Sequence, residues 1–234
     1  MLSQRLAELR NALRKAAAAA GRPMPTLVAV SKFQPAAAVA ELADAGQRAF
    51  GENYVQEAQA KRAELDRPGL EWHLIGHLQS NKAALAAELF DWVQSVDRTK
   101  LVDALAAARP PGRAPLNVLL QVNIDDEAGK HGCAPEQVQA LAAWVAARPT
   151  LALRGLMAIP APHADPALRR AAFARMKALF DALAAAHPGV DTLSMGMSGD
   201  FALAVAEGAT MVRIGTALFG SRPAPGSRDR AKAG

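Results

Sequence analysis

Short apolar runs of β-prone composition alternate with longer alanine-rich runs along almost the whole chain, and this alternation limits the possible folds. Eight runs are expected to be strands: Thr26–Ser31, Arg48–Gly51, Glu71–Ile75, Trp92–Val96, Leu116–Asn123, Leu153–Ile159, Thr192–Met195 and Thr210–Ile214. The stretches between them are expected to be helices: Ala36–Ala45, Val55–Leu65, Asn81–Leu89, Thr99–Ala108, Pro135–Ala147, Pro166–Ala186 and Asp200–Glu207. Because parallel strands need long crossover connections, this order favours a parallel sheet covered by helices.

Eight strand–helix units within 234 residues fit one closed (β/α)8 barrel better than two separate domains. An open doubly wound sheet is the alternative fold, and it usually carries a glycine-rich motif directly after its first strand. Here the first strand ends in Val28-Ala29-Val30-Ser31-Lys32, which contains no glycine. We therefore predict a single α/β TIM barrel over residues 1–220, preceded by an amphipathic helix in Met1–Lys15.

The formal net charge of +5 raises the question of a nucleic-acid partner. Residues 221–234 hold four basic residues and one acidic residue, so three of the five net charges lie in this tail. The tail is rich in proline, glycine and alanine, and we expect it to be disordered. Aromatic residues make up only 5% of the chain, which leaves few side chains to stack on bases. No specific nucleic-acid binding is expected.

Cysteine content and the absence of long apolar stretches bear on the compartment. Cys133 is the single cysteine, which excludes an internal disulfide and a cysteine-based metal cluster within one chain. Charged residues such as Arg5, Glu8 and Arg10 interrupt the apolar residues near the N-terminus, unlike the apolar centre of a signal peptide. No stretch is apolar for long enough to span a bilayer. A cytoplasmic protein without membrane attachment is expected.

Lys32 is the leading candidate for chemistry. The functional groups of such barrels gather at the carboxyl ends of the strands, and Lys32 directly follows the apolar run Val28–Val30. Apolar neighbours disfavour the ammonium form and lower its pKa, so the amine is expected to act as a nucleophile toward a carbonyl group. The alternative is a lysine whose ammonium group only extends from a strand end into solvent.

Glycines and hydroxyl groups end the last two predicted strands. The segment Ser194–Asp200 contains two glycines and Ser198, and the final strand is followed by Gly215 and Thr216. Phosphate sites after strands seven and eight are common in this barrel, because glycines let backbone amides approach the anion. Ser198 and Asp200 could instead only cap the following helix.

Other polar residues receive weaker interpretations. Arg213 lies among apolar residues and needs a partner, either a carboxylate or a ligand atom. We do not expect a metal site at His73 and His77, because His73 falls in the third strand. Cys133 is expected to be a small packed residue, and Tyr54 is expected to pack under the next helix.

Several motifs occur together and in one order along nearly the whole chain. They are Ala29–Lys32, Phe50–Tyr54, Trp72–Lys82, Ser95–Arg98, Gln121–Asn123 with Glu127 and Lys130, Gly155–Met157, Leu193–Ser198 and Val212–Thr216. In this combination the chain resembles the pyridoxal phosphate homeostasis proteins, which are similar to the barrel domain of alanine racemase.

The resemblance implies pyridoxal 5'-phosphate (PLP) as cofactor and a Schiff base on Lys32. It implies further that Ser198, Gly215 and Thr216 hold the phosphate, that Arg213 faces the pyridine nitrogen, and that Asn53 lines the ring. The expected cofactor-binding residues are therefore Lys32, Asn53, Met195, Ser198, Arg213, Gly215 and Thr216. No catalytic residue and no metal ligand is expected.

The expected role is the storage, buffering or delivery of PLP by a monomer, with PLP-dependent apoenzymes as candidate recipients. In the racemases, a second domain supplies a tyrosine base, whereas here only the basic tail follows Gly220 and the one tyrosine is Tyr54. A PLP-dependent racemase-like enzyme is the alternative, and an aldolase that uses a Schiff base without cofactor is a third possibility. A visible absorbance band from bound PLP would separate the last from the others.

Overall fold

A closed barrel of eight parallel strands forms the centre of the structure, a computed structural model that describes residues 1–65, 67–127 and 129–220. The strands pair in the order of the chain, and β8 pairs with β1 to close the barrel. Their bounds are β1 Thr26–Val30, β2 Ala49–Glu52, β3 Glu71–Leu74, β4 Trp92–Val96, β5 Leu116–Val122, β6 Leu151–Ala158, β7 Thr192–Ser194 and β8 Met211–Ile214. The predicted (β/α)8 barrel is confirmed, and the predicted tail 221–234 lies outside the described residues.

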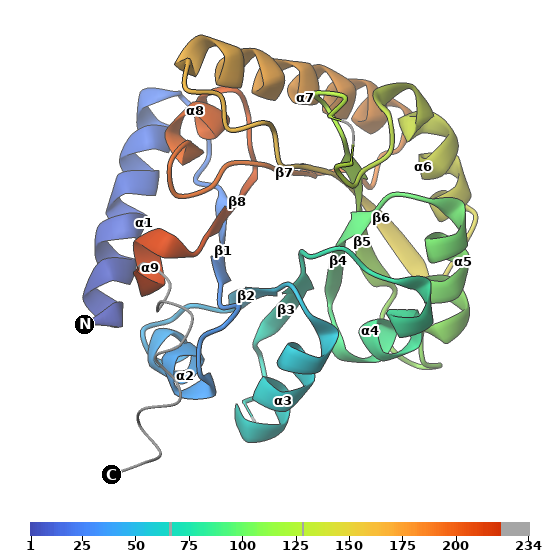
Figure 1. Cartoon of the computed structure of the whole chain (residues 1–234), viewed down its shortest axis with the longest axis horizontal. Coiled ribbons are helices and arrows are strands. Elements are labelled where there is room, and N and C mark those ends of the chain that lie inside the picture. Colours follow the sequence, from blue (N-terminus) through green and yellow to red (C-terminus); the bar gives the residue numbers. More distant parts are fainter. Residues whose placement is uncertain (66, 128, 221–234) are drawn as a thin grey trace.

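Helices surround the barrel on its outer side, as Figure 1 shows. Their bounds are α1 Leu2–Ala19, α2 Ala36–Asp44, α3 Val55–Leu65, α4 Ala83–Leu89, α5 Thr99–Ala108, α6 Val138–Ala146, α7 Pro166–Ala186, α8 Phe201–Ala206 and α9 Thr216–Phe219. The leading helix α1 packs against α2, α8 and α9, so it covers the place where the barrel closes. Among the described residues, no helix has both the length and the apolarity needed to cross a membrane.

The strands are buried on both faces, which explains their nearly continuous apolar sequence. Successive side chains of a strand point to opposite faces, so each strand contributes both to the barrel interior and to the layer under the helices. A small group of side chains forms a separate core cluster: Val28, Ala49, Trp92, Leu119, Met157 and Met211. A larger cluster, with Leu13, Phe50 and Phe173 among its fully buried members, joins the sheet to the helices.

Strand pairing sets the bounds where they differ from the sequence prediction. Strand β6 begins at Leu151 rather than Leu153, because Leu151 pairs with Leu116 of β5. Strand β2 extends to Glu52, which pairs with Leu74 of β3. The predicted helix Pro135–Ala147 begins with a 3-10 turn, and a short helix, α9, follows β8 where none was predicted.

Candidate functional site

The predicted cofactor residues lie along one arc of the barrel mouth. Ala29 of β1 pairs with Ile214 of β8, and Val30 pairs with Gly51 of β2, so the ends of β8, β1 and β2 are neighbours. Strand β7 pairs with β8 on the other side. All the predicted cofactor residues lie in β8 or follow one of these four strands: Lys32, Asn53, Met195, Ser198, Arg213, Gly215 and Thr216. The sequence order separates these residues, and the closure of the barrel brings their strands together (Figure 1).

Lys32 lies in a tight turn at the end of β1 and is half-buried. The N–H group of Gln34 donates to the carbonyl of Ser31 at 3.0 Å, which closes the turn. Phe33 takes a φ of 64°, a left-handed conformation that side chains other than glycine rarely adopt, and Glu57 accepts a hydrogen bond from its N–H group. The turn therefore places Lys32 at the mouth with a fixed backbone.

A buried ion pair supports this turn from below. The ammonium group of Lys61 donates to the carbonyl of Ser31 at 2.6 Å and to Oε1 of Glu52 at 2.7 Å. The hydroxyl of Ser31 donates to the same carboxylate oxygen at 2.6 Å. Burial raises the pKa of Glu52, while the hydrogen bonds from Lys61 and Ser31 act in the opposite direction. Sequence analysis gave these residues no role, since their pairing depends on α3 packing against β1 and β2.

The hydroxyl of Ser198 faces the segment that follows β8. Its Oγ accepts a hydrogen bond from the N–H group of Ala217 at 3.3 Å, next to Thr216. The carboxylate of Asp200 accepts from the N–H group of Met197 at 2.6 Å and makes no capping bond to α8. Asp200 therefore makes no side-chain cap on α8, whereas Ser198 accepts from the N–H group of the second residue of α9.

Gly215 lies against the end of β1. A Cβ atom at this position would lie 3.3 Å from Cβ and from the carbonyl oxygen of Val30, which is tighter than most contacts of that kind. The absence of a side chain keeps the backbone of β8 close to that of β1. Gly215 therefore brings the segment with Thr216 near the turn that carries Lys32.

Arg213 is buried in β8, and its partners are neutral oxygen atoms. Nη1 donates to Oγ of Ser194 at 2.7 Å, and Nη2 donates to the carbonyl of Ala158 at 2.9 Å. Burial lowers the pKa of Arg213 to about 10, so the guanidinium stays charged at neutral pH. Sequence analysis offered two kinds of partner for Arg213, a carboxylate or a ligand atom. In the described part of the chain, the hydroxyl of Ser194 and the carbonyl of Ala158 orient the guanidinium instead.

A chain of hydrogen bonds leads from Arg213 into the barrel interior. Ser194 donates to Oε1 of Gln94 at 2.7 Å, and Nε2 of Gln94 lies 2.9 Å from Nδ1 of His73. The other ring nitrogen of His73 lies 2.7 Å from Oε1 of Glu71. The direction is consistent throughout: if Gln94 donates to Nδ1, then Nε2 carries the proton and donates to the carboxylate.

Sequence analysis missed this series of hydrogen bonds. Gln94 within the buried run Trp92–Val96 could have indicated it, because a buried amide needs hydrogen-bond partners. The series also decides the interpretation of His73. Both ring nitrogens of His73 are hydrogen-bonded and the side chain is fully buried, so it cannot pair with His77 on a metal ion.

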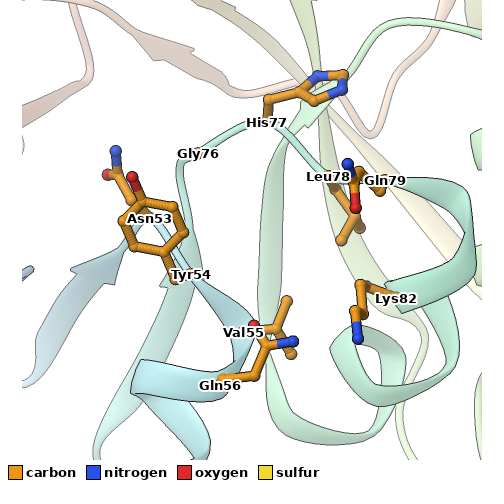
Figure 2. A pocket seen from close by; sticks show the side chains of 9 residues that line it. All are labelled: Asn53, Tyr54, Val55, Gln56, Gly76, His77, Leu78, Gln79 and Lys82. Carbon is orange, nitrogen blue, oxygen red and sulfur yellow. The ribbon is translucent and has the colours of Figure 1, made fainter.

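A cavity of about 410 Å³ opens beside Asn53 at the mouth (Figure 2). It is lined by Asn53, Tyr54, Val55, Gln56, Gly76, His77, Leu78, Gln79 and Lys82. Gly76 is required by the close approach of two loops, since a Cβ atom there would lie 2.3 Å from the carbonyl oxygen of Asn53. Figure 2 shows His77 at the top of the lining residues, with Asn53 and Tyr54 at the left and Lys82 at the lower right.

Tyr54 does not pack under the next helix as the sequence predicted. Its side chain is 54% exposed, and its ring lies 6.0 Å from that of Phe33, centroid to centroid. Val55, the next residue, fills the buried position at the start of α3 instead. Cys133, in contrast, is buried as predicted, and burial raises the pKa of its thiol to about 11.

Comparison with known proteins identifies the family. A family model described as alanine racemase, N-terminal domain, matches residues 4–223. The pyridoxal phosphate homeostasis protein of Pseudomonas aeruginosa is 55% identical over 223 residues, which cover 94% of this chain and 96% of that protein. Its counterpart in Escherichia coli K12 is 50% identical over 226 residues, which cover 94% of this chain and 97% of that protein.

A solved structure agrees with the sequence relatives. PipY of Synechococcus elongatus, determined with PLP bound, superimposes with a TM-score of 0.83 at 42% identity and covers 94% of this chain and 100% of that one. The matches span nearly the full length of both partners and include the barrel described above. The chain therefore belongs to the pyridoxal phosphate homeostasis protein family, whose barrel is that of the alanine racemase N-terminal domain.

Proposed function

We propose that this protein binds PLP on the arc formed by the ends of β7, β8, β1 and β2, and that it stores, buffers or delivers the cofactor. The observation that carries the proposal is the pairing of β1 with β8, which brings the ends of these two strands together at the rim. Lys32 follows one of these ends, and Gly215 and Thr216 follow the other. An amine and a proposed phosphate-binding segment on one part of the rim suit a phosphorylated aldehyde. PLP bound to the related PipY structure supports the same ligand.

The residues present fit PLP by their chemistry. Ser198 and Thr216 offer hydroxyl groups to a phosphate, and the close approach of Gly215 to Val30 leaves backbone rather than side chain at the rim. The N–H group of Ala217 donates to Oγ of Ser198, so the segments that follow β7 and β8 meet at this point. Bound PLP supplies an aldehyde that a lysine amine can hold as a Schiff base, together with an electron-withdrawing ring.

Lys32 is the proposed site of that Schiff base. Its turn is fixed by Ser31, Glu57 and Lys61, so the amine is presented from a rigid backbone rather than from a loose loop. Asn53 is proposed to line the ring from the neighbouring strand end, and Met195, which is buried in the larger core cluster, to support the cofactor from the end of β7.

Arg213 is proposed to donate to the ring nitrogen of the cofactor. The hydrogen bonds to Ser194 and Ala158 hold the guanidinium in one place. Because Arg213 remains charged at neutral pH, the ring nitrogen would not readily take up a proton, and the ring would withdraw electrons less strongly. The resemblance implies the same arrangement in the racemases, so the lack of the racemases' tyrosine base, rather than Arg213, is the reason to propose a carrier.

We further propose that the protein is not an enzyme. Racemization requires an acid and a base on opposite faces of the cofactor. The candidates besides Lys32 are Tyr54 and His77, which line the cavity beside Asn53. The exposure of Tyr54 makes the racemase-like alternative worth testing, and proton exchange at Cα of amino acids tests it directly.

The remaining expectations concern setting and partners. A cytoplasmic location is proposed because the single cysteine is a buried thiol rather than half of a disulfide. A monomer is proposed because the exposed large apolar side chains, such as Phe33, Trp144 and Leu168, come from separate elements. PLP-dependent apoenzymes are the proposed recipients.

The test of the proposed function is an absorbance spectrum of the purified protein before and after borohydride treatment, with mass analysis of its peptides. A visible band that borohydride removes, together with a PLP-modified peptide that contains Lys32, is the expected result. A colourless protein that takes up no added PLP would overturn the proposal.

A further inference from the structure

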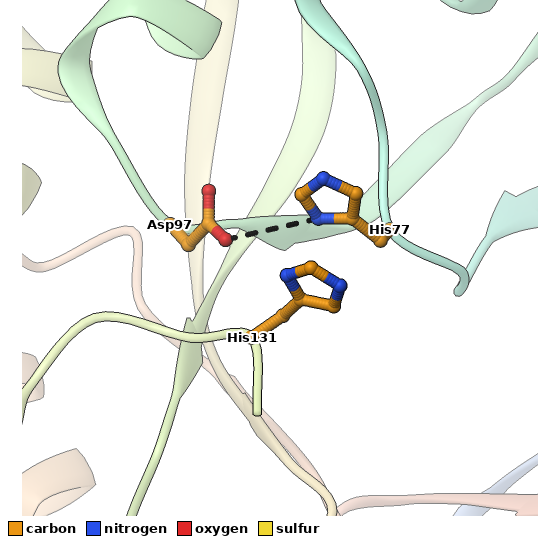
Figure 3. Close-up of side chains that lie close together, drawn as sticks. All are labelled: His77, Asp97 and His131. Atoms are coloured by element: carbon orange, nitrogen blue, oxygen red, sulfur yellow. Dashed lines mark ion pairs between the residues drawn. The ribbon is translucent and has the colours of Figure 1, made fainter. Parts of the chain in front are cut away.

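Three potential metal ligands meet at the barrel mouth, on loops that follow three consecutive strands. His77 follows β3, Asp97 follows β4, and His131 lies in the loop after β5. One ring nitrogen of each histidine and one oxygen of Asp97 all lie within 4.8 Å of one another. Nδ1 of His77 is 4.0 Å from Oδ2 of Asp97, and the imidazole rings stack with their centroids 3.6 Å apart (Figure 3).

The fold fixes the backbone that carries the two histidines. Gly76 holds the loop before His77 against Asn53, where no side chain would fit. The carbonyl of His131 accepts a hydrogen bond from Nε2 of Gln121 at 3.1 Å, and the nearby N–H group of Cys133 donates to the carbonyl of Gln121 at 2.9 Å. Both histidines therefore approach each other on anchored loops.

Asp97 is oriented by its neighbour Arg98. Nη1 of Arg98 donates to Oδ1 of Asp97 at 2.5 Å, while Nη2 donates to the carbonyl of Leu78 at 2.8 Å. This arrangement leaves Oδ2 directed toward His77, as Figure 3 shows. Hydrogen bonds that orient a carboxylate in this way are typical of the surroundings of metal ligands. The guanidinium also offsets part of the negative charge, so a moderate rather than a very tight affinity is expected.

The ligand atoms lie close enough to one another to share one metal ion after a small adjustment. Ligand atoms around a tetrahedral zinc ion, each at about 2.0–2.1 Å, are roughly 3.4 Å apart. The 4.0 Å separation between His77 and Asp97 must shrink by roughly 0.6 Å, and a pair at the full 4.8 Å by roughly 1.4 Å. The stacked rings must also rotate so that both lone pairs converge.

We propose that His77, Asp97 and His131 bind a divalent transition-metal ion of the zinc class, with water completing its coordination. Two imidazole nitrogens and one carboxylate oxygen are a donor set that Zn²⁺ accepts, and three protein ligands leave a position open to solvent. Sequence analysis considered only His73 with His77 and expected no metal ligand, and it did not bring His77, Asp97 and His131 together because they are far apart in the chain. The proposal does not rest on the PLP site, since it uses none of the residues proposed to bind PLP.

The test is a titration of tag-free, full-length protein with ZnCl₂ by calorimetry, after dialysis against a chelator and with any bound cofactor left in place. His187→Ala is the matched control, because His187 lies at the C-terminal end of α7, outside the cluster. We expect one equivalent of zinc in the wild type and the control, and affinity at least about tenfold weaker in His77→Ala and in His131→Ala.

Two results would overturn the proposal: no zinc binding by the wild type in the titration, or wild-type affinity in His77→Ala or in His131→Ala. Circular dichroism without metal establishes that each variant folds. In addition, zinc should raise the Tm of the wild type and of His187→Ala, but not that of the double variant His77→Ala/His131→Ala, since only a bound ligand stabilises the folded state. Equal shifts in all three proteins would mean that zinc binds elsewhere.

Discussion

Nζ of Lys61 lies 2.7 Å from Oε1 of Glu52, and both side chains are buried directly behind the turn that carries Lys32. The ammonium group also donates to the carbonyl of Ser31, the residue before Lys32. Two charges removed from water each need the other, so the loss of one partner leaves an uncompensated buried charge. The position of Lys32, the proposed PLP lysine, thus depends on an ion pair whose two residues are not among those proposed to bind PLP.

Lys61→Met should lower the free energy of unfolding by about 3–5 kcal/mol, because it leaves Glu52 buried without its cation. The double variant Glu52→Gln/Lys61→Met should recover part of this loss, since it removes both charges. Urea unfolding of both proteins measures the difference. A loss below about 1 kcal/mol in Lys61→Met, the range of exposed pairs, would contradict the structural role.

Lys32→Ala should abolish borohydride-dependent attachment of PLP while shifting the unfolding midpoint only slightly. The side chain is half-buried at the mouth and contributes little to core packing. Mass analysis of the reduced protein gives the readout. Lys130→Ala serves as the control, because Lys130 is an exposed lysine paired with Glu127 in the loop after β5. Attachment that persists in Lys32→Ala and disappears in Lys130→Ala would move the assignment to Lys130.

Ser198→Ala combined with Thr216→Val should weaken PLP binding without preventing Schiff-base formation. A hydrogen bond from a hydroxyl to a charged phosphate contributes about 1.5–3 kcal/mol, so the pair should cost at least about tenfold in affinity. Titration of the visible absorbance measures the change, with Ser3→Ala on α1 as a control for serine removal. Unchanged affinity would place the phosphate elsewhere.

Cys133 should resist thiol reagents in the folded protein. Its pKa is raised from an ordinary value of 9.0 to about 11, so at pH 8 about one thiol in a thousand is ionised, and burial blocks access. Because the folded state disfavours the thiolate, its contribution to stability is present below pH 9.0 and is lost as the pH rises toward about 11. Iodoacetamide labelling, with and without urea, measures the reactivity of the thiol in the unfolded and in the folded protein. Rapid labelling at pH 8 without urea would contradict the burial.

Proton exchange at Cα of alanine and other amino acids in deuterated water should be slow with the pure protein. Enzymes of this kind turn over at roughly 1–1000 per second, and rates in that range would overturn the carrier proposal. Tyr54→Phe supplies the control, since Tyr54 is the exposed candidate for a second base. Slow exchange that is equal in the wild type and in Tyr54→Phe is the expected result.

The barrel, and the gathering of the proposed cofactor residues at its mouth, could be predicted because both follow from local patterns in the chain. Periods of apolar residues mark strands and helices, and their order favours parallel pairing. The carboxyl ends of parallel strands meet at one rim, so Lys32 and Gly215 were expected at the same mouth before any contact was known. What the sequence determined is therefore the architecture and the residues that end each strand.

Only the tertiary structure decided which side chains meet. Ser194 and Gln94 are 100 residues apart and hydrogen-bond inside the barrel, and His77 stacks on His131 across two loops. Register and the direction of each side chain depend on how a strand pairs with both neighbours in the closed barrel. The exposure of Tyr54 likewise followed from the space that Val55 fills. Local periodicity does not contain this information, because it arises from contacts between elements that the sequence keeps apart.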